Sequence, residues 1–357
     1  MSNLQHLRQL KQGVDHWNTW RQRPEVPQAL DLSRADLAEL QLSAADLTKA
    51  NLTGANLTKA NLTGANLTNA NLTGANLTSA NLTSANLTSA NLTDANLTDA
   101  NLTDASFKGV NLTQIDLKKV NLTSINFSEV NLKDTDLSNL NFKAANLSEA
   151  NLIGANLSHA ILNGANLIGA NLSHAILSRA DLSNALLNRT NLCNTNLESV
   201  NLTNSFLIMA NLSQARLQNA TMIRANLGSA ILSGAVLNGV TLVDAQLIEA
   251  HLSTASFQKA DLTGANFSQA YMHATNFEQA ILIKANFSRV EAEKANFALS
   301  DLSQANFTQA NLTQAYLSDT KLIGANFTGA ILRNAVLTLA DLTDTNFDQA
   351  DLTNLIK

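Results

Sequence analysis

The sequence predicts an all-β solenoid, in which the chain winds around a continuous core of apolar side chains. Three observations predict this fold. A five-residue period runs from Leu32 to Leu352 without an insertion, a small apolar residue precedes a large one by two positions in most periods, and phenylalanines recur at multiples of twenty residues. A period this short indicates a repeat architecture, whatever the length of the chain would otherwise suggest.

The five-residue period is strict. Every fifth position from Leu32 to Leu352 holds Leu, Phe or Met, except Ala292, which gives 65 consecutive units. A step of five residues advances about 500° around an α-helix, so these side chains would be spread over all of its faces. Asn and Thr, which fill many units, are also poor helix formers. The period therefore argues against helices in the repeats.

The alternation within a unit predicts which side chains are buried. In the unit Ala50-Asn51-Leu52-Thr53-Gly54, the small and the large apolar residue lie on one face of an extended segment. The last two residues must then turn the chain, and repeated turns wind it with both apolar positions inside. The expected core positions include Leu52, Leu57, Leu62, Leu67, Phe267, Phe287, Phe307, Phe327 and Phe347.

The spacing of the phenylalanines predicts how many units complete one coil. Phe occupies positions 107 and 127, every twentieth position from 267 to 347, and every twentieth position from 257 to 297. Among the phenylalanines at the large position, only Phe142 departs from these two series. If four units complete a coil, residues twenty apart stack and the rings form two columns, as close packing of like side chains favours.

Units such as Ala50-Asn51-Leu52-Thr53-Gly54 and Ala55-Asn56-Leu57-Thr58-Lys59 resemble the A(D/N)LXX pattern of the pentapeptide-repeat protein family. The resemblance covers about nine-tenths of the chain. It implies a right-handed quadrilateral parallel β-helix, with one unit on each side and four units in each coil. The 65 units would then make about 16 coils.

Residues 3–22 are expected to form one amphipathic helix, because Leu, Val and Trp recur there at helical spacing. Trp17 and Trp20 are the two tryptophans of the chain. A solenoid must cover its first coil to protect apolar side chains and an open backbone edge. We therefore interpret residues 1–29 as an N-terminal cap and residues 30–357 as the β-helix, with partner binding as the alternative role of the helix. The segment Trp17-Asn18-Thr19-Trp20-Arg21 also resembles the leader of cyanobacterial members of the family.

The composition excludes several classes of function. A net charge of −5 over 357 residues does not indicate electrostatic binding to nucleic acid. The apolar runs are too short to cross a membrane and no signal-peptide core is found, so we expect a cytoplasmic protein. Cys193 has no recognisable catalytic partners, and we interpret His251 and His273, with Tyr271 between their columns, as surface residues and not metal ligands. We expect no enzyme, no cofactor and no metal.

The strongest candidate site is a patch of apolar residues at positions that face outward in other units. It is centred on the unit 205–209, and a contiguous exposed apolar patch often marks an interaction site. The alternative is that these residues are scattered substitutions that the repeat tolerates. The residues of this predicted patch are Phe206, Ile208, Met209, Leu186, Ile168 and Ile248.

Two further regions depart from the repeat. Residues 108–143 carry Val or Ile at most small positions and many charges of both signs, which we interpret as a solvated band, with a docking site as the alternative. The last coil has no recognisable cap, and an open coil invites pairing with another chain. We therefore expect end-to-end self-association through the C-terminal coil.

The sequence thus predicts a non-catalytic structural or regulatory scaffold that binds an unknown protein through the β-helix surface. Members of the family that bind DNA gyrase mimic DNA with an acidic rod. Here the corresponding column, which contains Asp181, Asp261, Asp301 and Asp341, is interrupted by Ile281 and Lys321, so DNA mimicry is the alternative. Ice binding through Thr and Asn ladders is a third and weaker hypothesis for the function.

Overall fold

The computed structural model describes residues 3–113 and 115–357, and its repeating unit explains each letter of the sequence pattern. In the unit 50–54, the Asn51 side-chain oxygen accepts hydrogen bonds from the Thr53 backbone N–H at 3.1 Å and from the Thr53 hydroxyl at 2.6 Å. The Ala55 N–H closes the turn on the Leu52 carbonyl at 2.9 Å. Gly54 lies at the corner with φ of 63°, a left-handed conformation that glycine adopts without strain. Asn and Thr therefore build the turn.

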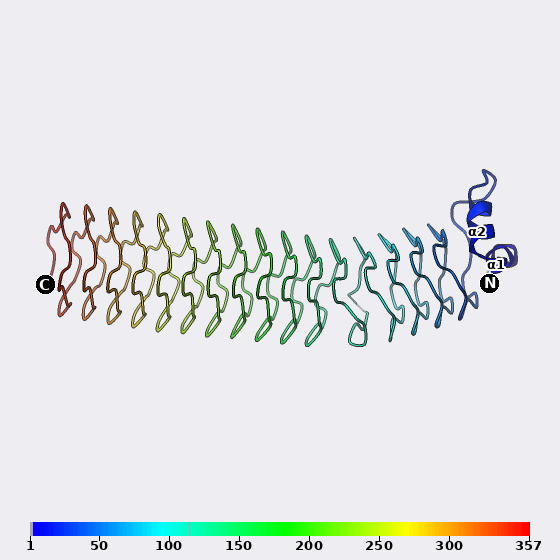
Figure 1. Ribbon diagram of the computed structural model, residues 1–357, viewed down its shortest axis with the longest axis horizontal. Coiled ribbons are helices and arrows are strands. Elements are labelled where there is room, and N and C mark those ends of the chain that lie inside the picture. Colours follow the sequence, from blue (N-terminus) through cyan, green and yellow to red (C-terminus); the bar gives the residue numbers. More distant parts are fainter. Residues whose placement is uncertain (1–2, 114) are drawn as a thin grey trace. The chain divides into compact units, whose positions relative to one another are not determined.

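Residues twenty apart pair in parallel, so four units complete a coil (Figure 1). Asn51 bridges Asn71, the Leu52 N–H donates to the Asn71 carbonyl at 2.7 Å, and the Gly54 N–H donates to the Thr73 carbonyl at 2.8 Å. Each side contributes a single bridge residue, and no longer strand occurs in the described residues. A side of five residues, two of which turn the corner, is too short for a conventional strand.

The core contains the side chains that the period predicts. Leu52, Leu57, Leu62 and Leu67 are fully buried. In the column that contains Phe267, the ring of Phe287 stacks on that of Phe267 at a centroid distance of 5.0 Å and on that of Phe307 at 4.8 Å. The interplanar angles are 5° and 6°. Rings of the two columns also meet edge to face, for example Phe277 and Phe287 at 6.0 Å. This combination of stacked and T-shaped pairs is favourable for aromatic rings.

The chain divides into two compact units, one of residues 1–156 and 165–170, the other of residues 157–164 and 171–357. In the first unit the winding is less regular after residue 110. Asp116 and Asn121 form no bridge, although they hold the bridge position of their units. Val110, Ile115 and Val120 stand there at the small position, where Ala stands in regular coils. Val130 and Val240 hold the same position directly before bridged residues, so the volume of the side chain at the small position does not by itself account for the loss of pairing.

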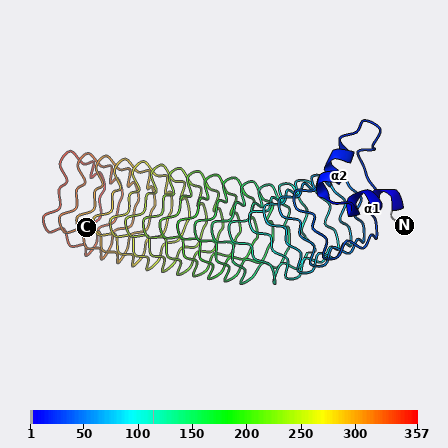
Figure 2. The same cartoon turned by 45° about the vertical axis from the view of Figure 1, so that its right-hand side comes forward.

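The N-terminal segment forms two helices, α1 (Leu4–Lys11) and α2 (Val14–Arg21), instead of the single helix expected over residues 3–22 (Figures 1 and 2). The break lies at Gln12 and Gly13. Gly13 adopts φ of 107°, which is incompatible with a continuous helix. The Asn3 side chain caps α1 by accepting from the Gln5 N–H.

These helices complete the open edge of the first coil. In later coils, the N–H of the bridge residue donates to a carbonyl of the preceding coil, as Asn66 donates to Ala45. Asp46 has no preceding coil, and its N–H donates to the Asn18 side-chain oxygen at 2.8 Å instead. The Asp46 carbonyl accepts from the Trp17 indole N–H, also at 2.8 Å. Trp17 is fully buried and Trp20 nearly so. Side chains of α2 thus replace the missing backbone partners of the edge.

Candidate protein-binding surfaces

Four residues of the predicted patch lie together in the second unit. Leu186 and Phe206 occupy the same column and form a parallel bridge. The Phe206 side chain is 44% exposed and Met209 is 54% exposed, while Ile208 is half-buried beside them. The wall of the solenoid therefore presents several large apolar side chains to solvent at one place.

The other two residues of the predicted patch do not join this cluster. Ile168 belongs to the first unit and is half-buried. Ile248 is half-buried as well, and it is separated from Ile208 by the coil that carries Gly228, because the Met209 N–H donates to Gly228 and the Ser229 N–H donates to Ile248. We therefore define the apolar patch as Leu186, Phe206, Ile208 and Met209.

Met209 stands at a corner that is costly for such a residue. Its φ is 58°, in the left-handed region, where side chains with a Cβ are disfavoured. Leu299 and Leu339 occupy equivalent corners with φ of 61°, and they are 50% and 80% exposed. Most corners carry Gly or a polar residue instead. Nearly all corners share the left-handed conformation, so it is the exposed apolar side chain that makes these three positions candidates for a function outside the core.

A second apolar surface, around Leu299, was missed by the sequence reasoning. A hollow of about 310 Å³ is lined there by Ile281, Ile283 and Leu299 among others. The signal that could have revealed it is an apolar residue at the corner position of the unit. At its rim, the Lys321 ammonium lies 3.4 Å from an Asp301 carboxylate oxygen. Burial raises the pKa of Asp301, but hydrogen bonds from Ser303 and Lys321 outweigh it and leave that pKa below its usual value.

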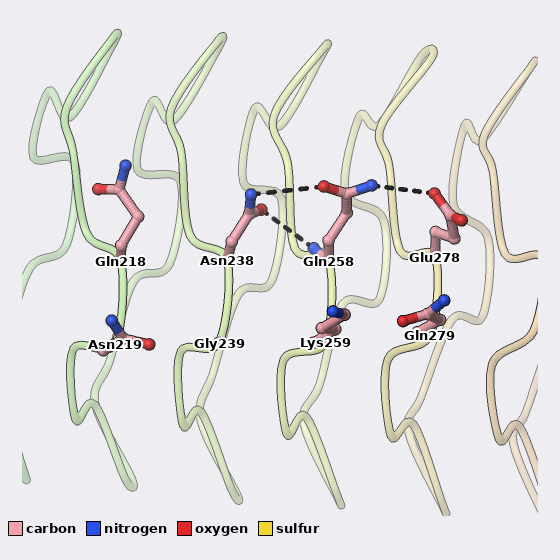
Figure 3. A pocket seen from close by; sticks show the side chains of 8 residues that line it. All are labelled: Gln218, Asn219, Asn238, Gly239, Gln258, Lys259, Glu278 and Gln279. Atoms are coloured by element: carbon pink, nitrogen blue, oxygen red, sulfur yellow. Dashed lines mark hydrogen bonds between the residues drawn. The ribbon is translucent and has the colours of Figure 1, made fainter.

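A further hollow is a groove of about 520 Å³ that is lined mainly by amide side chains (Figure 3). Gln258 donates to a Glu278 carboxylate oxygen at 2.9 Å and accepts from Asn238 at 3.5 Å. In the adjacent row Gly239 lacks a side chain, and a Cβ there would lie 2.7 Å from the Asn219 side-chain oxygen. The groove thus follows one wall of the second unit and offers hydrogen-bonding groups along it.

Charges of opposite sign pair in the band at residues 108–143. Lys108 lies 3.1 Å from Glu129, and Lys118 lies 2.7 Å from Asp136. These four side chains are about half exposed. Hydrogen bonds from Lys118 and then Ser138 lower the pKa of Asp136 to about 2. Pairing within the band agrees with the interpretation as a solvated surface.

Replacing Asp136 by Asn is expected to cost less than about 1 kcal/mol of stability at neutral pH, because exposed ion pairs contribute little. Since the folded-state pKa of Asp136 is lowered, its contribution is present above the unfolded-state value of about 3.9 and is lost as the pH falls toward 2. The difference in urea midpoint between the original protein and the variant should therefore shrink between about pH 4 and pH 2. A difference that grows over this range would contradict the assignment.

The core positions of the last coil are only partly covered. Phe347 is half-buried, although it stacks on Phe327 at 5.1 Å, and Leu352 is 36% exposed. The end-to-end association expected from the sequence stays a prediction.

No group of three or more His, Cys, Asp or Glu side chains in residues 3–113 and 115–357 is arranged to hold a metal ion. The Cys193 sulfur accepts a hydrogen bond from the adjacent Asn194 amide at 3.2 Å. The helices of the described part of the chain are too short and too polar to span a membrane.

A family model described as pentapeptide repeats matches overlapping segments that together span residues 30–123 and 125–354. The comparison with curated proteins finds no match. The comparison with solved structures finds similar chains, but their TM-scores are low, so the family match and the repeat geometry identify the architecture.

Three of these solved structures illustrate how the similar chains differ in source and in described function. HetL, a pentapeptide repeat protein involved in heterocyst differentiation regulation from the cyanobacterium Nostoc sp. strain PCC 7120, is 31% identical over 64% of this chain and 90% of its own, with a TM-score of 0.24. QnrB1, a plasmid-mediated fluoroquinolone resistance protein, is 18% identical over 55% of this chain and 90% of its own, with a TM-score of 0.33. A pentapeptide repeat protein from the thylakoid lumen of Arabidopsis thaliana is 34% identical over 32% of this chain and 79% of its own, with a TM-score of 0.24.

Proposed function

The chain belongs to the pentapeptide-repeat family, and we propose that it is a non-catalytic scaffold that binds a protein partner through the wall of its solenoid. The observation that carries the proposal is the apolar patch of Leu186, Phe206, Ile208 and Met209. Its side chains project from a wall whose backbone is hydrogen-bonded to both neighbouring coils. Such a wall presents side chains in a fixed arrangement, which lowers the entropic cost of binding a partner.

We further infer that the winding is right-handed with four sides and that the 65 units make about 16 coils. Parallel pairing of residues twenty apart supports four units per coil in both compact units. In this arrangement the core uses the small and large positions, and three positions of each unit remain for the outer surface. Recognition would then be encoded where these outer positions depart from Asn, Thr and Ser.

Replacing both Phe206 and Ile208 by Ser is expected to abolish capture of the partner from an extract of the native cell, because buried aromatic and aliphatic anchors dominate most interfaces. Neither side chain lies in the core, so far-UV circular dichroism and the urea midpoint should stay unchanged. The same double replacement at Ile231 and Ile331, which are exposed elsewhere in the second unit, serves as the control. Undiminished capture by the Phe206 and Ile208 variant would contradict the proposal.

Regulation of a signalling or differentiation factor is the form of scaffold function that the resemblance to cyanobacterial members favours. DNA mimicry is supported less well. It needs regularly repeated negative charge, whereas in this column Lys321 pairs with Asp301 and Ile281 carries no charge. A gyrase supercoiling assay with the intact protein separates the two, because only a DNA mimic should inhibit the enzyme.

A further inference from the structure

The hollow beside Leu299 is a groove between two rows of outward-facing side chains in the second unit. One row is the corner residues Gln279, Leu299 and Asp319, and the other is the bridge residues Ile281, Asp301 and Lys321. Ala280 and Ser300, which separate the rows, are 1% and 2% exposed, so their side chains lie in the core. The wall between the rows therefore has no outward side chain, and this leaves the space of about 310 Å³.

One end of this groove is apolar. Ile281 and Ile283 come from one coil, and Leu299 comes from the corner of the next. Ile281 is 44% exposed, Leu299 is 50% exposed, and Ile283 is half-buried between the wall and solvent. Three aliphatic side chains from two successive coils thus offer a surface on which an aliphatic side chain of another molecule can be buried.

The other end of the groove carries a negative charge that is not compensated. Asp301 is paired, because it lies 3.4 Å from the Lys321 ammonium and accepts from the Ser303 N–H at 3.1 Å. The Asp319 carboxylate, which also lines the groove, makes no hydrogen bond and no ion pair with residues 3–113 and 115–357. Two carboxylates face one ammonium here, so the field at this end favours a cation.

We propose that the groove binds an extended segment of a partner protein in which an aliphatic side chain is followed, two residues later, by arginine. The centre of the apolar end lies between the coils of Ile281 and Leu299. The coil of Asp319 is one and a half coil spacings further on, about 7 Å at a spacing of about 4.8 Å. Side chains two residues apart point to the same face of an extended segment and are also about 7 Å apart. The arginine can then donate to the Asp319 carboxylate.

This groove shares no residue with the apolar patch of Leu186, Phe206, Ile208 and Met209, so the two surfaces can be tested separately. Ile208 reports on the patch. Ile176 is a control for exposed isoleucine, because it is 42% exposed, close to the value for Ile281. Its bridge partner is Asn196, whereas Ile281 has the bridge partner Asp301.

The test is an NMR titration of the full chain labelled with ¹³C in the δ1 methyl groups of isoleucine. The probe is the acetylated, amidated peptide Gly-Leu-Ser-Arg-Gly. With this peptide the Ile281 and Ile283 signals should shift and saturate below about 10 mM, and the Ile176 and Ile208 signals should stay in place. Three comparison peptides should bind more weakly: Gly-Leu-Ser-Glu-Gly reverses the charge, Gly-Ser-Ser-Arg-Gly lacks the aliphatic side chain, and Gly-Leu-Arg-Ser-Gly places the two on opposite faces.

The variant Asp319→Asn should weaken binding of the arginine peptide about threefold or more, because it removes the charged acceptor. Asn is tolerated at a left-handed corner, so this variant and Leu299→Asn, which should weaken binding as much, keep the fold. Asp244→Asn, at an exposed corner with φ of 57°, should have no effect. The proposal is overturned if Ile281 does not shift up to about 10 mM peptide, if Ile176 shifts equally, or if any comparison peptide is as effective as the probe.

Discussion

Replacing Phe287 by Ala is expected to lower the free energy of unfolding by about 3–5 kcal/mol. Phe287 is fully buried, stacks on Phe267 and Phe307, and meets Phe277 and Phe297 edge to face. The variant loses the transfer free energy of the ring and leaves a cavity. The neighbouring coils cannot collapse into it, because their spacing is set by backbone hydrogen bonds.

Urea unfolding followed by far-UV circular dichroism measures this loss, and Phe347→Ala is the matched control. Phe347 belongs to the same column, but it is half-buried and has Phe327 as its one ring contact in the described residues. Its replacement should cost clearly less than that of Phe287, because less apolar surface leaves the core. Equal losses for the two variants would show that the ring column does not stabilise the second unit as described.

The solenoid could be predicted from the sequence because the same five-residue pattern determines both the local turns and the contacts between neighbouring coils. Apart from the last coil, each Leu or Phe of the period is buried in the core, and Asn and Thr at fixed positions form the turn. The twenty-residue spacing of Phe predicted stacking between coils, and Phe267 and Phe287 stack at 5.0 Å. The five-residue pattern therefore predicted both the turns of the outer wall and the buried side chains of the core.

Other features could not be predicted, for physical reasons that differ between regions. The apolar spacing of residues 3–22 is compatible with a single helix, and only the backbone conformation at Gly13 divides it into α1 and α2. Near residue 116 the apolar pattern continues unchanged, although Asp116 and Asn121 form no bridge. A binary pattern of polar and apolar residues contains no information on volume or on backbone strain.

The surfaces were only partly predictable. Phe206 and Met209 were identified because their chemistry departs from the repeat, and the structure exposes both. Leu299 departs in the same way, but its hollow depends on neighbours twenty residues away.

The central claim is that four units complete a coil, so that residues twenty apart are in contact. Deleting residues 268–287 removes one coil and places Phe307 against Phe267 and Phe297 against Phe257, so both ring columns continue. Deleting residues 268–282 removes three units and keeps the five-residue period, but it moves every later Phe to another side. The ring contacts across the junction are then lost.

The most direct measurement compares the urea midpoints of these two deletion variants. We expect the twenty-residue deletion to unfold close to the original protein, because stability in a solenoid comes mainly from contacts between neighbouring coils. The fifteen-residue deletion should be about 2–4 kcal/mol less stable, from lost ring pairs and misfitted volumes at the junction. If the variant with fifteen residues removed were as stable as the variant with twenty removed, or more stable, the four-unit coil would be contradicted.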